Sequence, residues 1–205
     1  FDLMQVMLPF PSPTGGIHRY EITENTGSST WNTYYRWLKN IKEMYDASVE
    51  AQDPNYQAIA LTLNALVASN LTDVFGDVPM SEALRGDEQL FYPTFDRQQD
   101  IYQNLLNNLE EANTLFDASK SMVYGTEILY GNNVAKWKKF CNSLHMRLLL
   151  RVSNVMPDAL TKVKNMLDDP STYPVFANNA DGALLNLTGI TPLVSPWGRP
   201  VDFPT

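Results

Sequence analysis

Apolar residues recur three or four positions apart through most of the middle of the chain. This spacing places them on one face of an α-helix, because the helix completes a turn in about 3.6 residues. The pattern predicts five helices of roughly 12 to 22 residues, at about positions 31–49, 54–74, 96–116, 133–155 and 157–167.

Capping residues set the expected ends of these helices. Asp53 before Pro54 combines an N-cap with a proline at the first helical position, where the missing N–H would have no partner in any case. Gly76 is suited to the positive φ that ends a helix. Asp96, followed three positions later by Gln99, resembles a capping box at the start of the third helix.

The fourth helix has an expected cap at Asn133, and Pro157 lies in the expected first turn of the fifth. Short connections make neighbouring helices antiparallel, and helix pairs of this length resemble tetratricopeptide repeats. The expected fold class is therefore mainly α, with tetratricopeptide-like antiparallel helix pairs. Little β structure is expected: after Pro170 the pattern changes, and only 173–176 and 183–187 read as short strands.

Prolines divide the chain into regular and irregular parts. Three of them lie in the first thirteen residues and six lie from Pro170 onward, whereas only four interrupt the long stretch between. Proline disfavours continuous helix. We therefore expect a loop-rich segment at 1–28, a helical body at 29–169 and a Pro-rich loop segment at 170–205, which would begin a truncated ligand-facing region.

Charge narrows the classes of partner. The chain has 15 Lys and Arg against 23 Asp and Glu, a net charge of −8. A nucleic-acid partner requires a basic face, so none is expected, and an anionic membrane surface is disfavoured for the same reason. The chain has no run of 18 consecutive apolar residues, so the sequence predicts no membrane span. The lone Cys141 excludes an internal disulfide and multi-cysteine metal sites.

Catalytic groups are sparse. Cys141 and His145 lie four positions apart on one predicted helix, but Cys141 belongs to the apolar face, where a thiol is usually inert. Glu110 and Glu111 are adjacent and point apart, so they read as solvated surface. The sequence also lacks the G-x-S-x-G motif that places a catalytic serine on a sharp turn. We expect no catalytic residue.

Two acidic segments contain oxygen ligands that calcium accepts. Asp73 and Asp77 flank Gly76, and residues 178–182 read NNADG. Caps and turns explain both segments as well, so a structural calcium ion stays open and no other metal or cofactor is expected. Arg147 and Arg151 are expected to pair with a carboxylate such as Asp73 or Asp77.

Aromatic residues in loops are the better candidates for ligand binding. Trp197 and Arg199 lie in the segment SPWGRP, where no periodic element buries them, and Tyr20 lies in an N-terminal loop. A tryptophan beside an arginine suits a sugar face or a peptide, by stacking and hydrogen bonding. Packing of Trp197 onto the helical body is the alternative. Four further aromatic residues fall in expected loops: Phe91, Tyr92, Tyr124 and Tyr130.

Four segments then carry a family resemblance. They are LTDVFGDVPMSEA (71–83), PTFDRQQDIYQNLLNNLEEA (93–112), LYGNNVAKWKKFCNSLHMRLLLRVS (129–153) and STWNTYYRWLKNI (29–41). In composition and order they are similar to motifs of the SusD/RagB family of outer-membrane nutrient-binding lipoproteins. Family members are usually about twice as long, so the resemblance implies a fragment trimmed at both ends.

The resemblance implies a helical, tetratricopeptide-like scaffold with a loop-rich binding face and no bond-breaking chemistry. It implies a cell-surface lipoprotein of the outer membrane, held by a lipid anchor outside this chain. It further implies that the protein binds a glycan or a peptide and delivers it to a TonB-dependent transporter of the SusC/RagA type. The family shares no common ligand motif, so no binding residue is carried over.

Two other functions fit parts of the sequence. The many acidic and aromatic residues would suit an α-helical glycoside hydrolase, which needs two carboxylates about 5 to 10 Å apart in a cleft. Helix pairs alone would suit an intracellular tetratricopeptide-type scaffold that binds a peptide. The hydrolase would differ from a nutrient-binding protein by cleaving its ligand, and the scaffold would differ by lying inside the cell.

Overall fold

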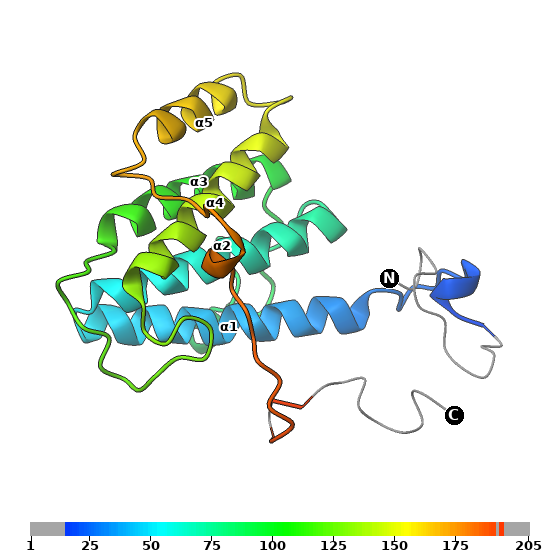
Figure 1. Cartoon of the computed structure of the whole chain (residues 1–205). Helices are drawn as coiled ribbons and strands as arrows, with labels where there is room; N and C mark the ends of the chain where they lie inside the picture. Colours follow the sequence, from blue (N-terminus) through cyan, green and yellow to red (C-terminus); the bar gives the residue numbers. More distant parts are fainter. Residues whose placement is uncertain (1–14, 192, 195–205) are drawn as a thin grey trace, which may run out of the picture. The chain divides into compact units, whose positions relative to one another are not determined.

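The structure is a computed structural model, which describes residues 15–191, 193 and 194. Within these residues the elements are five α-helices and three one-turn 3₁₀ helices (Figure 1). The α-helices are α1 (Ser28–Glu50), α2 (Pro54–Phe75), α3 (Gln98–Leu115), α4 (Val134–Val152) and α5 (Ala159–Asp168). The 3₁₀ helices are η1 (Ile17–Arg19), η2 (Gly86–Glu88) and η3 (Asn179–Asp181). The expected mainly α, tetratricopeptide-like fold is confirmed.

The chain forms two compact units. The larger unit is Thr33–Leu184, and the smaller combines Phe1–Asn32 with Leu185–Thr205. Within the described part of the smaller unit, Glu21 Oε2 accepts a hydrogen bond of 2.9 Å from Gly16 N, and Ile190 pairs with Leu193 in an isolated bridge. The division at 28 and 169 expected from the prolines stays a prediction.

The core of the larger unit is built around α2. This helix packs against α3 and α4, α3 also packs against α4, and α4 packs against α5 and η3. Ala58, Ala65 and Ala68 of α2 are fully buried, as are Leu71 and, from α3, Leu109. Small residues let helix backbones approach closely, and each buried leucine stabilises the fold by roughly 1.5–3 kcal/mol.

By length and composition alone, α2 could also cross a membrane. Its most apolar 18-residue window has a mean hydropathy of 1.4, although no run of 18 consecutive apolar residues occurs. Half of that window is buried inside the protein. The core helix of a globular domain meets the same test, so α2 is weak support for a membrane span.

Most expected helix ends are confirmed. Asp53 Oδ1 accepts hydrogen bonds from Asn55 N at 3.1 Å and Tyr56 N at 3.3 Å, with Pro54 in the first turn. Gly76 has a φ of 75° and donates its N–H to the carbonyl of Thr72.

The start of the fourth helix agrees with the sequence-based expectation, whereas the start of the fifth does not. Asn133 caps α4 through a 3.0 Å hydrogen bond from Lys136 N to its side chain, as expected. In contrast, α5 begins at Ala159, two residues later than Pro157. Val155, the last residue of the expected fourth helix, is 82% exposed because α4 already ends at Val152.

Two local expectations are wrong. Asp96 does not cap α3, whose N-cap is Arg97 without a side-chain hydrogen bond. No strand forms at 173–176 or 183–187, and the described residues contain only isolated bridges. In the first of these segments Phe176 N donates instead to Ser143 Oγ on α4, at 2.9 Å. A strand needs a neighbouring strand for its backbone groups, and 173–176 packs against α4 instead.

Candidate functional site

The segment 71–83, which joins α2 to the following loop, is held by side chains that come from distant parts of the sequence. Asp96 accepts hydrogen bonds from Met80 N at 2.7 Å, from Ser81 N at 2.9 Å and from the Ser81 hydroxyl at 2.6 Å. Tyr35 of α1 donates its hydroxyl to the carbonyl of Pro79 at 2.8 Å. Partial burial of Asp96 opposes these bonds, but together they lower the pKa of its carboxyl.

Gln98 at the start of α3 closes the same junction. Its backbone N–H donates to Asp77 Oδ1 at 2.9 Å, and its side-chain amide donates to the carbonyl of Thr72 at 2.8 Å. The Thr72 carbonyl also accepts from Gly76 N, so the Gln98 amide gives it a second donor at the end of α2. Asp77 is therefore engaged with the backbone of α3.

Beside this junction, Asp73, Tyr102 and Arg151 form a hydrogen-bonded network across three helices. Tyr102 donates its hydroxyl to Asp73 Oδ1 at 2.7 Å, and Arg151 Nε lies 2.9 Å from Asp73 Oδ2. Arg151 Nε also donates to the Tyr102 hydroxyl at 3.2 Å. Burial and the adjacent Asp73 raise the pKa of Tyr102 to about 12. The expected pairing of Arg151 with Asp73 is confirmed.

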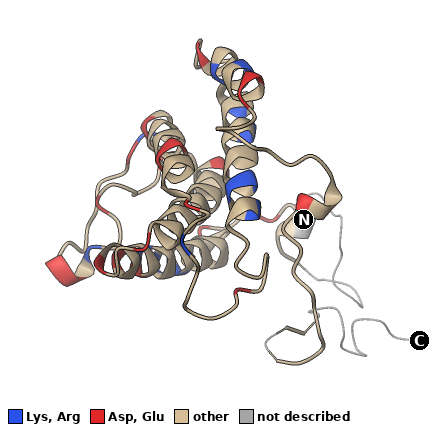
Figure 2. Ribbon diagram, turned by 60° about the vertical axis from the view of Figure 1, so that its left-hand side comes forward, with Lys and Arg blue, Asp and Glu red and all other residues tan. Residues whose placement is uncertain are grey.

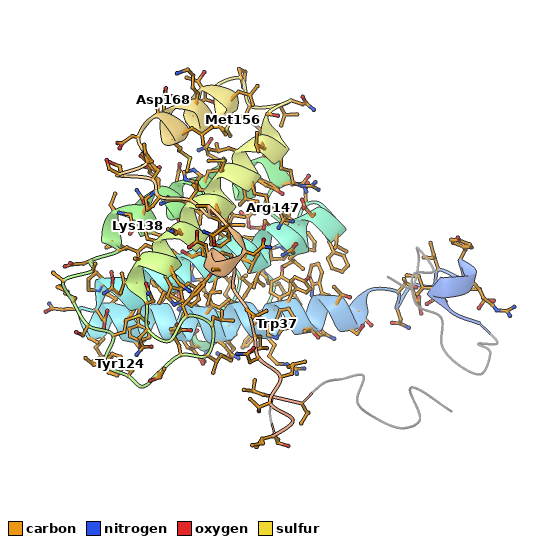
Figure 3. The ribbon with its side chains drawn as sticks, viewed as in Figure 1. Trp37, Tyr124, Lys138, Arg147, Met156 and Asp168 are labelled. Atoms are coloured by element: carbon orange, nitrogen blue, oxygen red, sulfur yellow. The ribbon has the colours of Figure 1, made fainter. Side chains whose placement is uncertain are left out.

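A groove of about 620 Å³ lies over this network. It is bounded by the end of α2, the first two turns of α3, the end of α4 and the turn into α5. Its polar lining includes Asp73, Tyr102 and Arg151, and its apolar lining includes Val155 and Met156. Figure 3 shows Met156 where the chain passes from α4 to α5, and Arg147 on α4. Arg147 is exposed.

Charge is unevenly distributed around the groove. α4 has five basic residues and no acidic residue, although the whole chain is acidic. Figure 2 shows these Lys and Arg residues along α4. The carboxylates of Asp73 and Asp181, from elements packed against α4, each lie within 2.9 Å of one of its cations, Arg151 and Lys139 respectively. The basic helix is therefore partly neutralised from both ends.

Cys141 is an inert core residue. Its side chain is fully buried, and burial raises the pKa of the thiol to about 12. A thiol with so high a pKa contains almost no thiolate, the nucleophilic form, at neutral pH. The structure thus agrees with the expectation that the spacing of Cys141 and His145 reflects a buried helix face.

His145 lies in a small polar cluster that the sequence did not predict. Its imidazole is buried, with Nδ1 3.7 Å from Glu110 Oε2, and the Tyr173 hydroxyl donates to the other oxygen of Glu110. Burial is the main cause that lowers the pKa of His145, although Glu110 opposes it. Glu110 was expected to be solvated surface, but Tyr173 folds back over it and leaves its side chain half-exposed.

The acidic segment at 178–182 forms a turn. Asp181 is buried, and its two carboxylate oxygens lie 2.9 Å from Lys139 Nζ and 2.8 Å from Ala177 N. Asn178 caps the turn by accepting from Ala180 N. The described residues contain no group of three or more His, Cys, Asp or Glu residues that could hold a metal ion. A structural calcium ion stays an untested prediction.

Of the predicted ligand residues, Trp197 and Arg199 lie outside the described residues. Tyr20 follows η1 with a φ of 62° and is 63% exposed. Other loop aromatics are more exposed, among them Tyr92 at 93% and Phe91 at 69%. The role of the three predicted ligand residues stays a prediction.

Tyr130 lies in a turn before α4, as expected, but its side chain belongs to the core. It is 8% exposed, and its ring meets Trp137 edge-on at 5.2 Å. Its hydroxyl also donates to the carbonyl of Asp181 at 3.1 Å, so it fixes η3 against α4. The groove over Asp73, Tyr102 and Arg151 was not predicted from the sequence. Its signals there were the expected pairing of Arg151 with Asp73 and the fact that each of three family-like segments contributes one of these residues.

Comparisons with known proteins agree on one family. A SusD-like family model, described as starch-binding and associating with the outer membrane, matches residues 1–205. Two solved structures share 31% identity with this chain at a TM-score of 0.69 and cover 82% of it: a chitin-binding protein and a Bacteroidetes AC2a SusD-like protein. A SusD/RagB family protein from Bacteroides thetaiotaomicron is 26% identical over 77% of this chain, with a TM-score of 0.64.

The matched part of each of these structures is small. The alignments cover 36%, 31% and 33% of the three solved chains, so this chain spans about a third of their length. A search of curated protein sequences gave no match.

Proposed function

The chain belongs to the SusD-like family of starch-binding proteins that associate with the outer membrane, and we propose that it captures a glycan at the cell surface without altering it chemically. The match of the family model to residues 1–205 is the observation that carries this proposal. The helical body supports it, because the helices build a scaffold on which binding loops are held in fixed positions.

Three carboxylates at and beside the groove support a binding function over catalysis. Asp73, Asp77 and Asp96 each accept hydrogen bonds that join one element to another. A glycosidase needs one carboxylic acid that gives up a proton and a second that activates water or attacks the sugar. Carboxylates that already fix the fold are poor candidates for either role.

A glycan is preferred over a peptide as the ligand. The matched family is described as starch-binding, and one similar solved structure is a chitin-binding protein. The predicted ligand residues Trp197, Arg199 and Tyr20 suit a sugar ring, because aromatic faces stack on apolar C–H surfaces and arginine donates paired hydrogen bonds.

The proposal extends to location and delivery. A lipid anchor outside this chain would hold the protein on the outer membrane, facing the exterior. There it would pass its ligand to a TonB-dependent transporter of the SusC/RagA type. The family description as associating with the outer membrane supports this location. Purification of the native protein in mild detergent should recover such a transporter with it, and its absence would contradict the delivery step.

Calorimetric titration of the full-length protein tests the ligand class. We expect binding heat with maltooligosaccharides or chitooligosaccharides, and chromatography of the recovered sugar should show the same chain length after prolonged incubation. Trp197→Ala should weaken binding about tenfold or more if its ring stacks on the sugar, since loss of an aromatic anchor commonly costs 2 kcal/mol or more. Trp37→Ala, at a half-exposed tryptophan of α1, is the matched control.

The alternatives give different results in the same experiment. Shortened oligosaccharides would contradict the proposal and favour a hydrolase. Binding heat with peptides alone would support a capture function but with a peptide as the ligand in place of a glycan. No binding of either ligand would contradict the proposed function as a whole.

A further inference from the structure

The guanidinium of Arg151 is held from one side only. Its Nε donates to Asp73 Oδ1 at 3.0 Å and to the Tyr102 hydroxyl at 3.2 Å. Its Nη1 and Nη2 atoms have no hydrogen-bond partner among the residues that the structure describes, and the side chain is 55% exposed. The network thus fixes the plane of the guanidinium and leaves two neighbouring donor nitrogens at the groove.

The groove pairs this donor edge with an apolar wall. Val155 is 82% exposed, and Met156 and Pro157 extend the wall through the turn between α4 and α5. Gln99, on the first turn of α3, lines the groove and is exposed. Planar polar groups that face an apolar surface suit a ligand with hydroxyls on its edge and C–H bonds on its face.

Charge and size narrow the ligand further. The cation of Arg151 is offset by Asp73, and Asp100 adds a second carboxylate to the lining. An anionic ligand would meet these two carboxylates, so a neutral ligand is favoured. The volume of about 620 Å³ lies within the range of small-molecule sites, about 300 to 1,000 Å³.

We propose that this groove is a binding site for a neutral saccharide, in which the Nη groups of Arg151 and the amide of Gln99 bind hydroxyls and Val155 and Met156 contact the ring. The choice of a saccharide rests on the proposed function. The site uses none of the three loop residues predicted from the sequence, so it adds a contact surface on the helical body.

Methyl NMR of the full-length protein tests the site directly. Chitobiose and maltose would be titrated into protein labelled at valine and methionine methyl groups. We expect the signals of Val155 and Met156 to shift and saturate with one of these sugars. The signal of Val123, which is 69% exposed in the loop before α4, should not move.

Two variants separate the groove from the rest of the protein. Arg151→Lys keeps the charge beside Asp73 but removes the planar donor pair, and it should weaken the saturation measured at Met156 about tenfold, as expected for hydrogen bonds to a charged donor. Val155→Asp should weaken it similarly by placing a charge on the apolar wall. Val123→Asp is the matched control and should bind as the unaltered protein does. Thermal unfolding of each variant checks that the fold is intact.

The outcomes distinguish this inference from the proposed function. If oligosaccharide binds by calorimetry while Val155 and Met156 do not shift, the groove is overturned and surface capture stands. Shifts that persist unchanged in Arg151→Lys and Val155→Asp would overturn the named contacts. If no saccharide produces heat or shifts, both proposals fail.

Discussion

At the residue scale, the hydroxyl of Tyr102 connects Asp73 to Arg151. Tyr102→Phe removes this hydroxyl and leaves Asp73 with Arg151 as its remaining side-chain partner. We expect the free energy of unfolding to fall by about 1 to 2 kcal/mol, the usual cost of losing a partly buried hydrogen bond to a charged group. Urea denaturation measures this loss.

The control for Tyr102→Phe removes the same atom at the surface. Tyr92 is 93% exposed, so Tyr92→Phe should leave the free energy of unfolding nearly unchanged. An equal loss in the two variants would show that the network contributes nothing to stability.

His145 makes stability depend on pH. The folded pKa lies below its ordinary value of 6.5, mainly because of burial. The groups that face it are Glu110 on α3, Lys162 on α5 and Tyr173 after α5. In the unfolded chain His145 binds a proton near pH 6.5, whereas in the folded protein it binds one only at lower pH. Its contribution to stability is therefore complete above pH 6.5 and is lost as the pH falls below that value.

Replacement of His145 isolates this contribution. The free energy of unfolding of the unaltered protein should decrease between pH 7.5 and 5 more steeply than that of His145→Gln, which cannot titrate. Carboxylates with lowered pKa values, such as Asp96, act at still lower pH and are common to both proteins. If the free energy of unfolding fell equally with pH in the two proteins between pH 7.5 and 5, the lowered pKa of His145 would be contradicted.

At the element scale, the end of α2 depends on the backbone conformation of one glycine. Gly76 has a φ of 75°, and a Cβ added there would meet nothing within 4 Å. The cost of Gly76→Ala is therefore conformational, at roughly 1 to 3 kcal/mol of unfolding free energy, because its φ of 75° and ψ of −127° lie in a region open mainly to glycine. Thermal denaturation should show a lower melting temperature without loss of helical circular dichroism.

Gly86→Ala is the comparison for that prediction. The added Cβ would lie in ordinary contact, 4.0 Å from Phe91, and no positive φ is present. This variant should be close to neutral. If Gly86→Ala were the more damaging of the two, the role assigned to the conformation of Gly76 would be wrong.

At the scale of the whole molecule, the chain combines a net charge of −8 with a basic α4. Two of the five cations of α4 form ion pairs with elements that pack onto this helix: Lys139 meets Asp181 and Arg151 meets Asp73. This balance fits a neutral ligand better than an anionic one, in agreement with the glycan that we propose.

The sequence by itself determined the helices and most of their ends. Helix spacing and caps such as Asp53 and Asn133 act over a few residues, so they can be read without knowing what packs nearby. The same local logic failed for Asp96, because backbone N–H groups of Met80 and Ser81, some fifteen positions earlier, compete for its carboxylate. It failed again for 173–176, which packs against α4 and finds no second strand.

Only the tertiary structure decided that Tyr102 joins Asp73 and Arg151, and that Arg151 pairs with Asp73 and not with Asp77. Tyr102 lies 29 positions from Asp73, and Arg151 lies 78 positions from it, yet all three meet at the groove. Periodicity tells which face of a helix is buried but not which helix covers it or at what height. The contacts among helix ends depend on how α2, α3 and α4 pack together, and that packing is fixed by the sum of many side-chain contacts across the core.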